Sequence, residues 1–453
     1  MRAAHRTITP APVTWKIGLS LALTLAILLA PRLAAALPSF AAQTNQPCAA
    51  CHVGAFGPQL KPFGRDFKLY GYTATDGKPH FPPIAATAIA SFTHTASDQP
   101  GGAAPGFRAN NNAAPDEASI YYAGRISESI GAFIEGNYDG VSRKISLGKT
   151  DIRLARDATL FEQEFVLGLT VNNTPTVSDL WNSTPAWGFP YNASKLAPTP
   201  LAAVLSDGDI DGHTIGLGGY GLWNETIYAE FALYQPVGRD LRNTLGENPY
   251  AQVNRISGAI PYWRLALQHE AGQHAFQIGT YGLRAAIWPN GDQSAGRTDT
   301  FTDIALDANW QWIADPKSVV SDMISAHATF IHETAALDAS RILVGSRGTN
   351  KLDVMRADVS YSFAATWTPT VQVFHSQGTR DAAYWATPNG RGNSTGAVFE
   401  LAWVPFGKPD SWSDRFNVRL AAQYVAYTEF DGSTRGAARN NALYLSIWSA
   451  LRF

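Results

Sequence analysis

Most of the chain after residue 82 alternates between apolar and polar residues with a period of two. In residues 301–312 one face carries mainly isoleucine, leucine, alanine and tryptophan, while the other carries mainly aspartate, asparagine and glutamine. Residues 159–171, 320–332 and 415–427 repeat this alternation. Because successive side chains of a β-strand point to opposite faces, the pattern predicts strands with one apolar and one polar face.

About sixteen such strands are predicted, an even number of the kind that bacterial single-chain barrels favour and enough to enclose an aqueous lumen. We expect long external loops at residues 98–116, 172–211, 237–258, 285–298 and 378–394, with shorter turns on the periplasmic side. The predicted strands are residues 84–95, 117–126, 128–139, 148–157, 159–171, 213–223, 225–235, 260–270, 273–284, 299–312, 319–333, 353–364, 366–376, 395–404, 415–428 and 440–453.

A soluble β-sandwich also alternates, so alternation alone does not choose between a sandwich and a membrane barrel. The predicted strands run about 10–14 residues, near the length that a membrane barrel requires. Charge is concentrated on one face, as expected with lipid outside and a wet lumen. The last strand ends at Phe453, which resembles the C-terminal signal of bacterial outer-membrane barrels. We therefore predict a mainly β fold, a transmembrane antiparallel barrel in contact with outer-membrane lipid.

Composition and charge narrow the choice of partners. Charged residues make up 16% of the chain and aromatic residues 11%. No stretch after the N-terminus offers the run of about 20 apolar residues that a membrane helix needs. The net charge of −2, without a sustained block of lysine and arginine, argues against nucleic acid as a partner.

Residues 1–36 have the features of a secretory signal peptide. Arg2, Arg6 and Lys16 precede an apolar run at residues 17–30, and residues 34–36 offer an A-x-A cleavage site. The apolar run is short for a bilayer span, although an uncleaved anchor is the alternative. Export would bring the rest of the chain into an oxidising compartment.

The chain has two cysteines, Cys48 and Cys51, and His52 follows directly. C-x-x-C-H is the attachment signature of c-type haem, in which two thiols bond the porphyrin and the adjacent imidazole binds the iron. A thioredoxin-like motif would need a βαβ context, a zinc site would need four ligands, and a plain disulfide would not require His52. We therefore predict one covalent haem c in residues 37–80. No Ser/His/Asp arrangement or other catalytic set stands out.

The segment after the motif predicts a short helix. Pro62 suits its first turn and Gly71 suits its C-terminal cap. An apolar stripe on this helix would pack on the haem, or on protein alone, while basic residues on the other side would lie near the haem propionates. The stripe is Phe63, Phe67 and Tyr70, and the basic residues are Arg65 and Lys68.

The sequence does not identify the sixth ligand of the iron. Methionine is the usual partner in cytochromes c, but Met323 and Met355 lie far along the chain. His80 is the nearest remaining histidine and is the candidate, although a lone loop histidine is more often solvated. The alternatives are Lys61, Lys68, His94 or an open position.

Four strings stand out near the start of the chain: LPSFAAQT at residues 37–44, CAACH at 48–52, FGRDFK at 63–68 and GY at 71–72. Over residues 37–73 they make the chain resemble the start of the fused outer-membrane cytochrome–porins, a family that includes the monohaem cytochromes of iron-oxidising bacteria. Beyond them the resemblance rests on architecture. It implies thioether bonds at Cys48 and Cys51, His52 as the proximal ligand, and a haem at or inside the barrel. It also implies electron passage from an extracellular donor, with Fe(II) as the candidate, to a periplasmic cytochrome or other acceptor.

Three hypotheses follow from these observations. The first is an outer-membrane electron-transfer protein, for which an Fe(II) oxidase activity stays an open question. The second is a porin-like channel for small solutes, in which the haem-bearing domain is a plug or redox sensor. The third is a soluble periplasmic haem protein with a β-sandwich. The predicted domains are the signal peptide at 1–36, a small helical cytochrome c-like domain at 37–80 and the barrel at 81–453.

Overall fold

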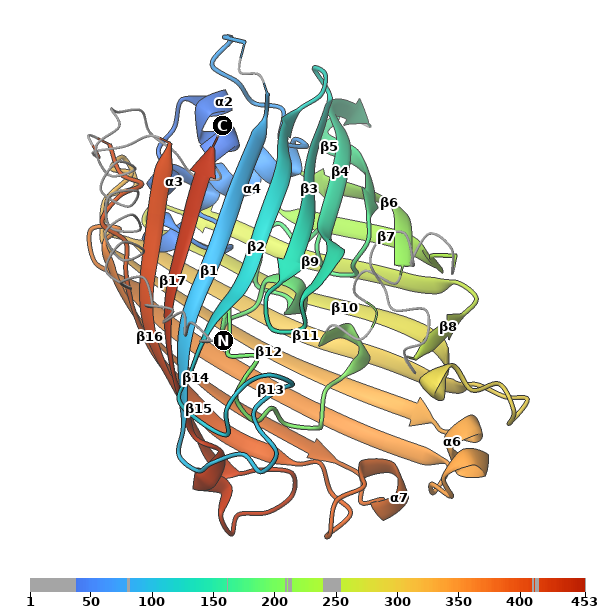
Figure 1. Ribbon diagram of the computed structural model, residues 1–453. Helices are drawn as coiled ribbons and strands as arrows, with labels where there is room; N and C mark the ends of the chain where they lie inside the picture. The colour runs from blue at the N-terminus through green and yellow to red at the C-terminus, as the bar shows by residue number, and fades with distance from the viewer. Residues whose placement is uncertain are drawn as a thin grey trace, which may run out of the picture.

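The computed structural model describes residues 38–79, 82–160, 162–207, 210, 214–238, 254–409, 411 and 415–452. One antiparallel sheet closes on itself, because β1 pairs with both β2 and β17 (Figure 1). The short β8 and the longer β9 both pair with β10, so together they act as one interrupted strand. The chain is therefore a closed barrel of sixteen strands, as predicted. The predicted signal peptide, His80 and Phe453 lie outside the described residues.

The strands follow the predicted segments closely. Their bounds are β1 Ile84–Thr95, β2 Asn112–Arg125, β3 Ile130–Asp139, β4 Lys144–Leu160, β5 Gln163–Asn172, β6 Thr214–Trp223, β7 Ile227–Pro236, β8 Arg255–Ser257, β9 Ile260–Ala271, β10 His274–Trp288, β11 Asp299–Ile313, β12 Met323–Ala336, β13 Thr349–Ser362, β14 Trp367–Gly378, β15 Ser394–Trp403, β16 Phe416–Glu429 and β17 Ala442–Arg452. The helices are α2 Pro38–Thr44, α3 Cys48–Cys51, α4 Pro62–Leu69, α6 Asp338–Leu343 and α7 Ala382–Trp385, and the 3-10 turns are η1 Val53–Ala55, η2 Pro185–Trp187, η3 Leu205–Asp207, η4 Pro289–Gly291 and η5 Ala437–Asn440.

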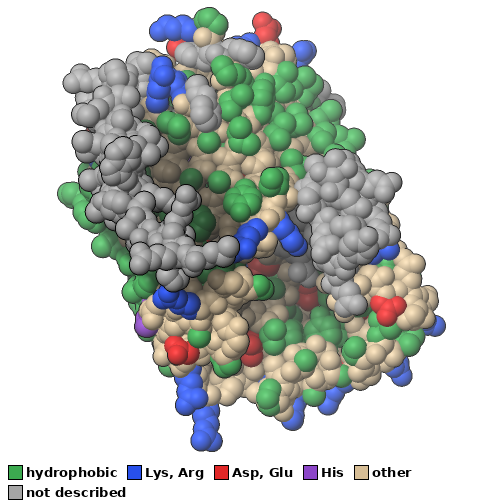
Figure 2. Space-filling model, viewed as in Figure 1, with side chains coloured by type: hydrophobic (Ala, Val, Ile, Leu, Met, Phe, Trp, Pro, Cys, Tyr) green, Lys and Arg blue, Asp and Glu red, His purple; other side chains and the backbone are tan. Residues whose placement is uncertain are grey.

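The alternation along each strand separates a lipid-facing surface from a polar lumen. On β11, Ile304 and Leu306 are 52% and 57% exposed, whereas Asp303 and Asp307 are 1% and 3% exposed. Apolar side chains gather on the upper right of the face shown in Figure 2, and large ones are exposed on most strands of the described chain. Polar groups point inward, where they can pair with one another. This arrangement is stable with hydrocarbon outside, and it places the chain in the outer membrane.

The two ends of the barrel differ in the length of their connections. Residues 126–129, 224–226, 272–273 and 363–366 make short turns at the end that also holds the C-terminus, which is the periplasmic pattern. Long connections gather at the opposite end, where α6 and α7 lie (Figure 1). Two predicted loops were too long, because β2 begins earlier and β10 ends later than the alternation indicated. In the described part of the chain, no helix is long and apolar enough to cross a membrane.

The N-terminal helices lie inside the barrel near its periplasmic end. Figure 1 shows α2, α3 and α4 close to the C-terminus, surrounded by strands. The Lys61 amine donates to the carbonyl of Val319 at 3.0 Å, and the Tyr72 hydroxyl donates to Asp151 at 2.6 Å. Gly71 follows α4 with a φ of 67°, the left-handed geometry predicted for its cap. The helical segment is therefore held by the wall rather than by a core of its own.

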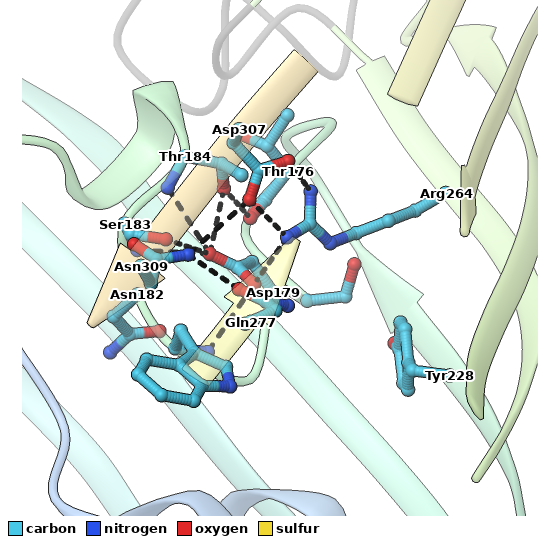
Figure 3. A network of polar contacts seen from close by, with 12 residues as sticks. Thr176, Asp179, Asn182, Ser183, Thr184, Tyr228, Arg264, Gln277, Asp307 and Asn309 are labelled. Carbon is cyan, nitrogen blue, oxygen red and sulfur yellow. Dashed lines mark hydrogen bonds and ion pairs between the residues drawn. The ribbon is translucent and has the colours of Figure 1, made fainter. Parts of the chain in front are cut away.

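The connection between β5 and β6 folds into the lumen instead of extending outward. Its Asp179 is fully buried, and the Arg264 guanidinium on β9 reaches it at 3.3 Å. The same guanidinium donates to both carboxylate oxygens of Asp307 on β11 at 2.9 and 2.8 Å. Figure 3 shows Asp179 at the centre of these contacts, where it also accepts from the backbone N–H groups of Ser183 and Thr184. The loop is thus pinned between the helices and the wall.

Candidate functional site

The two cysteines and the adjacent histidine form one compact turn. Cys48 and Cys51 begin and end α3, and His52 caps it by donating its backbone N–H to the Cys48 carbonyl at 2.9 Å. The chain then returns, and the Lys61 N–H donates to the Cys51 carbonyl at 2.8 Å. All three motif residues therefore belong to one short, internally bonded loop next to α4.

This turn opens on a cavity of about 880 Å³ in the lumen. Cys48, Cys51 and His52 line it at the periplasmic end. The surrounding wall is rich in aromatic side chains, which come from the helices, the strands and the inward loop. These are Phe56, Phe67, Tyr72, Tyr121, Phe133, Trp187, Tyr191, Tyr444 and Trp448. Its volume lies within the range of small-molecule and cofactor pockets.

The two thiols are free and are not activated as nucleophiles. Cys48 is buried, and its sulfur accepts a hydrogen bond from the Asn417 amide at 3.2 Å. Burial raises the pKa of Cys48 well above its usual range and that of Cys51 to about 12. Both are therefore thiols at neutral pH, unlike the thiolates of redox-active C-x-x-C motifs. Their environment suits structural attachment rather than thiol–disulfide exchange.

His52 presents a neutral imidazole to the same cavity. Burial lowers its pKa to about 4, against the opposing effect of the nearby backbone of Gln59 and Gly57. Its Nδ1 atom is buried and has no hydrogen-bond partner within the described structure. A buried polar atom without a partner is costly, and neutral imidazole is the form that binds metal ions. The site therefore has the donor that a haem iron would need.

Gly64 lets α4 approach the motif closely. A Cβ atom added here would lie 2.5 Å from the Cys51 carbonyl oxygen and 3.1 Å from a methyl group of Leu60. Because the nearest atom belongs to the backbone, no rotamer change relieves this contact. Gly64, the glycine of the FGRDFK string at residues 63–68, thus sets the distance between α3 and α4.

The far end of the cavity reaches the outer halves of β2, β3 and β4, where the lining is charged. Asp139, at the end of β3, accepts from the Lys195 amine at 2.8 Å, and Glu135 accepts from the Tyr121 hydroxyl at 2.8 Å. Asp116 accepts from the Tyr444 hydroxyl at 2.6 Å. Across the described ranges, no group of three or more His, Cys, Asp or Glu side chains is placed to hold a metal ion. The same cavity therefore extends from the C-x-x-C-H motif to the extracellular ends of β2, β3 and β4.

The three residues of the predicted apolar stripe on α4 do not all line the cavity. Phe67 is 7% exposed and lines both the cavity and an adjoining groove, whereas Phe63, which is 39% exposed, and Tyr70 line the groove alone. Of the three residues of the stripe, Phe67 alone therefore lines the cavity next to the motif. The helix is wedged at the lumen rim, so its neighbouring turns meet different surroundings.

The two basic residues of α4 are held in the lumen by the protein itself. Arg65 donates to Gln311 at 2.7 Å and pairs with Glu270 at 2.5 Å. The Lys68 amine lines the cavity, but it donates to the carbonyls of Val177 and Asp179 and to the Asn182 side chain, at 2.6 to 2.7 Å. Burial lowers the pKa of Lys68 to about 7. Both residues dock the helix, a role that spacing alone could not reveal.

Among the described residues proposed as the sixth ligand, Lys68 lines the cavity with His52, but its amine is engaged in three hydrogen bonds to the protein. Within the described lining of the cavity, His52 is the one histidine and methionine is absent. Lys61 is engaged with backbone carbonyls, and His94 bonds Asn111 on an exposed part of β1. His80, the first candidate, falls outside the described residues. Met323 is buried against Val53 and Ile313 instead of facing the cavity.

Several lining residues could not be found from the sequence. Asn417 and Trp448 lie about 370 and 400 positions after the motif, and only closure of the barrel brings them to it. Trp448 packs edge-on against Phe56, with ring centroids 5.0 Å apart. Trp187 and Tyr191 belong to a stretch that the sequence indicated as an external loop. Their polar and Pro-rich surroundings gave no signal that the loop turns inward.

Comparisons with known proteins return bacterial porins. The outer membrane channel DcaP of Acinetobacter baumannii matches with 8% identity and a TM-score of 0.44, over 82% of this chain and 96% of that chain. The anion-selective porin from Comamonas acidovorans matches with 9% identity and a TM-score of 0.44, over 82% of this chain and 98% of that chain. A loop-deletion mutant of OmpT from Vibrio cholerae matches with 9% identity and a TM-score of 0.43, over 81% of this chain and 97% of that chain. No protein-family model and no curated protein sequence matches the chain. At these values the likeness adds no functional argument, and the porin-like outer-membrane fold rests on the closed sixteen-strand topology itself.

Proposed function

We propose that this protein is an outer-membrane electron-transfer protein that holds one covalent c-type haem in the luminal cavity. Cys48 and Cys51 would form the thioether bonds, and His52 would bind the iron. The observation that carries the proposal is the convergence of the complete C-x-x-C-H motif on an aromatic cavity of about 880 Å³ inside a membrane barrel.

The residues present fit this group. His52 offers a buried ring nitrogen that lacks a partner, both thiols lie at the cavity wall, and the wall is apolar where the motif lies. Bound haem would supply a one-electron redox centre, tuned by its axial ligand and by burial. Asn417 holds the Cys48 sulfur at 3.2 Å, and Gly64 keeps α4 close to Cys51. The aromatic wall limits access of water.

The cavity also suggests the direction of transfer. Its charged end lies at the extracellular ends of β2 to β4, and Phe67 closes it on the periplasmic side. A small donor would enter from outside, and a periplasmic cytochrome or other acceptor would take the electron at α4. Fe(II) is the donor that the family resemblance implies, and it is the first to test.

A porin-like channel with a haem-bearing plug or redox-sensing domain is the second candidate. A sixteen-stranded barrel with a polar lumen favours it, because barrels of this size can carry an aqueous pore. Against free passage, the helical segment and the inward loop fill the lumen. Electron transfer and solute flux therefore need to be measured on the same preparation.

Reconstitution in liposomes separates these functions. The donor is supplied outside, an acceptor is trapped inside, and haem spectra and solute flux are recorded together. We expect covalent haem, reduction by the external donor and little flux. A Cys48→Ala/Cys51→Ala variant should lose covalent haem and electron transfer, with a Met355→Leu variant on the lipid-facing wall as control. Unchanged transfer without the cysteines would refute the proposal, whereas solute flux without transfer would favour the channel.

A further inference from the structure

A second concave surface lies on the periplasmic side of α4. It is a groove of about 360 Å³ lined by Phe63, Asp66, Phe67, Tyr70 and Arg125, together with residues 73–75. Phe67 lines both this groove and the luminal cavity. One aromatic side chain thus separates the surface from the space next to the C-x-x-C-H motif.

The floor of the groove is aromatic and partly open to solvent. Phe63 is 39% exposed, and Tyr70, the C-cap residue of α4, lies about two turns further along the same side of the helix. Phe67 beneath them is fixed by edge-on contacts with Phe40 and Tyr72, at centroid distances of 5.0 and 5.8 Å. An exposed phenylalanine beside ordered aromatic neighbours is a common centre for a protein interface.

The rim of the groove is acidic. Asp66 belongs to α4 itself, Asp157 accepts from the Tyr70 hydroxyl at 2.8 Å, and Glu270 pairs with Arg65. Burial, together with the nearby charges of Glu270 and Glu225, raises the pKa of Asp66 to about 6.

The three carboxylates outside α4 belong to the barrel rim. Asp157 lies near the end of β4, Glu225 in the β6–β7 turn and Glu270 near the end of β9. The basic groups among them are Arg125 in the groove and Arg65, whose side chain is 4% exposed. Four carboxylates therefore face two guanidinium groups, one of which is buried. The accessible charge around the aromatic floor is negative.

We infer that this groove is the docking surface for a periplasmic electron carrier whose contact face is ringed by lysine or arginine side chains. The inference rests on the proposed electron-transfer function and adds the place and chemistry of the partner. Opposite charges at the rim would steer the carrier, while the aromatic floor supplies an apolar contact over Phe67. Such an interface is short-lived and weakens as salt increases, because its charges lie at the rim.

The test uses the full-length protein in nanodiscs and a strongly basic soluble cytochrome c as the probe. Its lysine-acetylated form is the uncharged control. Direct binding is measured first, since it does not depend on haem in the barrel protein. We expect Asp66→Asn/Glu225→Gln to weaken binding about three- to tenfold at low salt, with no effect on the acetylated probe.

Two further variants keep the result interpretable. Glu225→Lys reverses the charge of an exposed residue in the β6–β7 turn, so it should weaken binding without loss of fold. Asp315→Asn removes an exposed carboxylate from the β11–β12 connection at the same end, and binding should be unchanged. Equal binding by wild type and the groove variants, or equal weakening by Asp315→Asn, would overturn the inference. Intact docking without electron transfer would instead count against the proposed function.

Discussion

Replacing Gly64 by alanine is a sharp test of the site, because two physical effects predict opposite signs. In a helix interior alanine is favoured over glycine by about 1 kcal/mol, so a spacious site would gain stability. In this structure the new Cβ atom would lie 2.5 Å from the Cys51 carbonyl oxygen. Overpacking against atoms that cannot rotate away costs about 1–3 kcal/mol, and a backbone contact this short belongs at the upper end. The net expectation is a loss of about 2 kcal/mol.

Hydrogen exchange measured on residues 38–79 reports this change locally. A loss of about 2 kcal/mol corresponds to exchange about thirtyfold faster in α3 and α4. Haem content per chain should fall as well, since the contact would push α4 away from the attachment residues. Gly238→Ala is the control, because an added Cβ atom there meets nothing within 4 Å. Slower exchange in Gly64→Ala than in wild type would refute the close packing of α3 and α4.

Three other substitutions test how the helices and the inward loop are held. Tyr72→Phe removes a hydrogen bond of 2.6 Å to Asp151 and should destabilise the helical segment by about 1.5–3 kcal/mol, seen as faster exchange in residues 38–79. Arg264→Met leaves the buried Asp307 unpaired, at a cost of about 3–5 kcal/mol, and should make residues 173–207 sensitive to protease. Asp66 has a pKa raised to about 6, chiefly by burial, so its contribution to stability is present below its ordinary pKa and is lost as the pH rises through about 6. Asp66→Asn should flatten the pH dependence of exchange in α4 between pH 4 and 7, and an unchanged slope would exclude this carboxylate as its source.

The barrel could be predicted from the sequence because its signal is repeated in every strand. Lipid on one side and a polar lumen on the other force the same two-residue period, so Ile304 and Asp303 reveal their faces without knowledge of their neighbours. The ends of the strands were predicted less accurately than their middles. β10 continues to Trp288 beyond the last clear alternation, because its cross-strand partners extend with it.

The candidate site was predictable only in part, for a different reason. Cys48, Cys51 and His52 are adjacent in the chain, so their chemistry could be recognised locally. Asn417 and Trp448 reach them only through closure of the barrel, and no local pattern marks them. The sequence also could not predict which surface each side chain of α4 faces. Periodicity groups Phe63 with Phe67, but the helix lies at a rim, where Phe67 lines both the cavity and the outer groove and Phe63 lines the groove alone.

How firmly the helical segment is held bears on the choice between a conduit and a channel. At least ten hydrogen bonds join residues 38–79 to the wall or to the inward loop, among them three from Lys68 and one from Tyr72. Even at about 0.5 kcal/mol each, at the low end for a net hydrogen bond, they amount to about 5 kcal/mol. A segment held this strongly would leave the lumen spontaneously in less than about one molecule in a thousand. Solute passage would then need a signal that weakens these bonds, whereas transfer of an electron through the closed lumen needs no movement of the segment. The packing of the helices therefore favours the conduit.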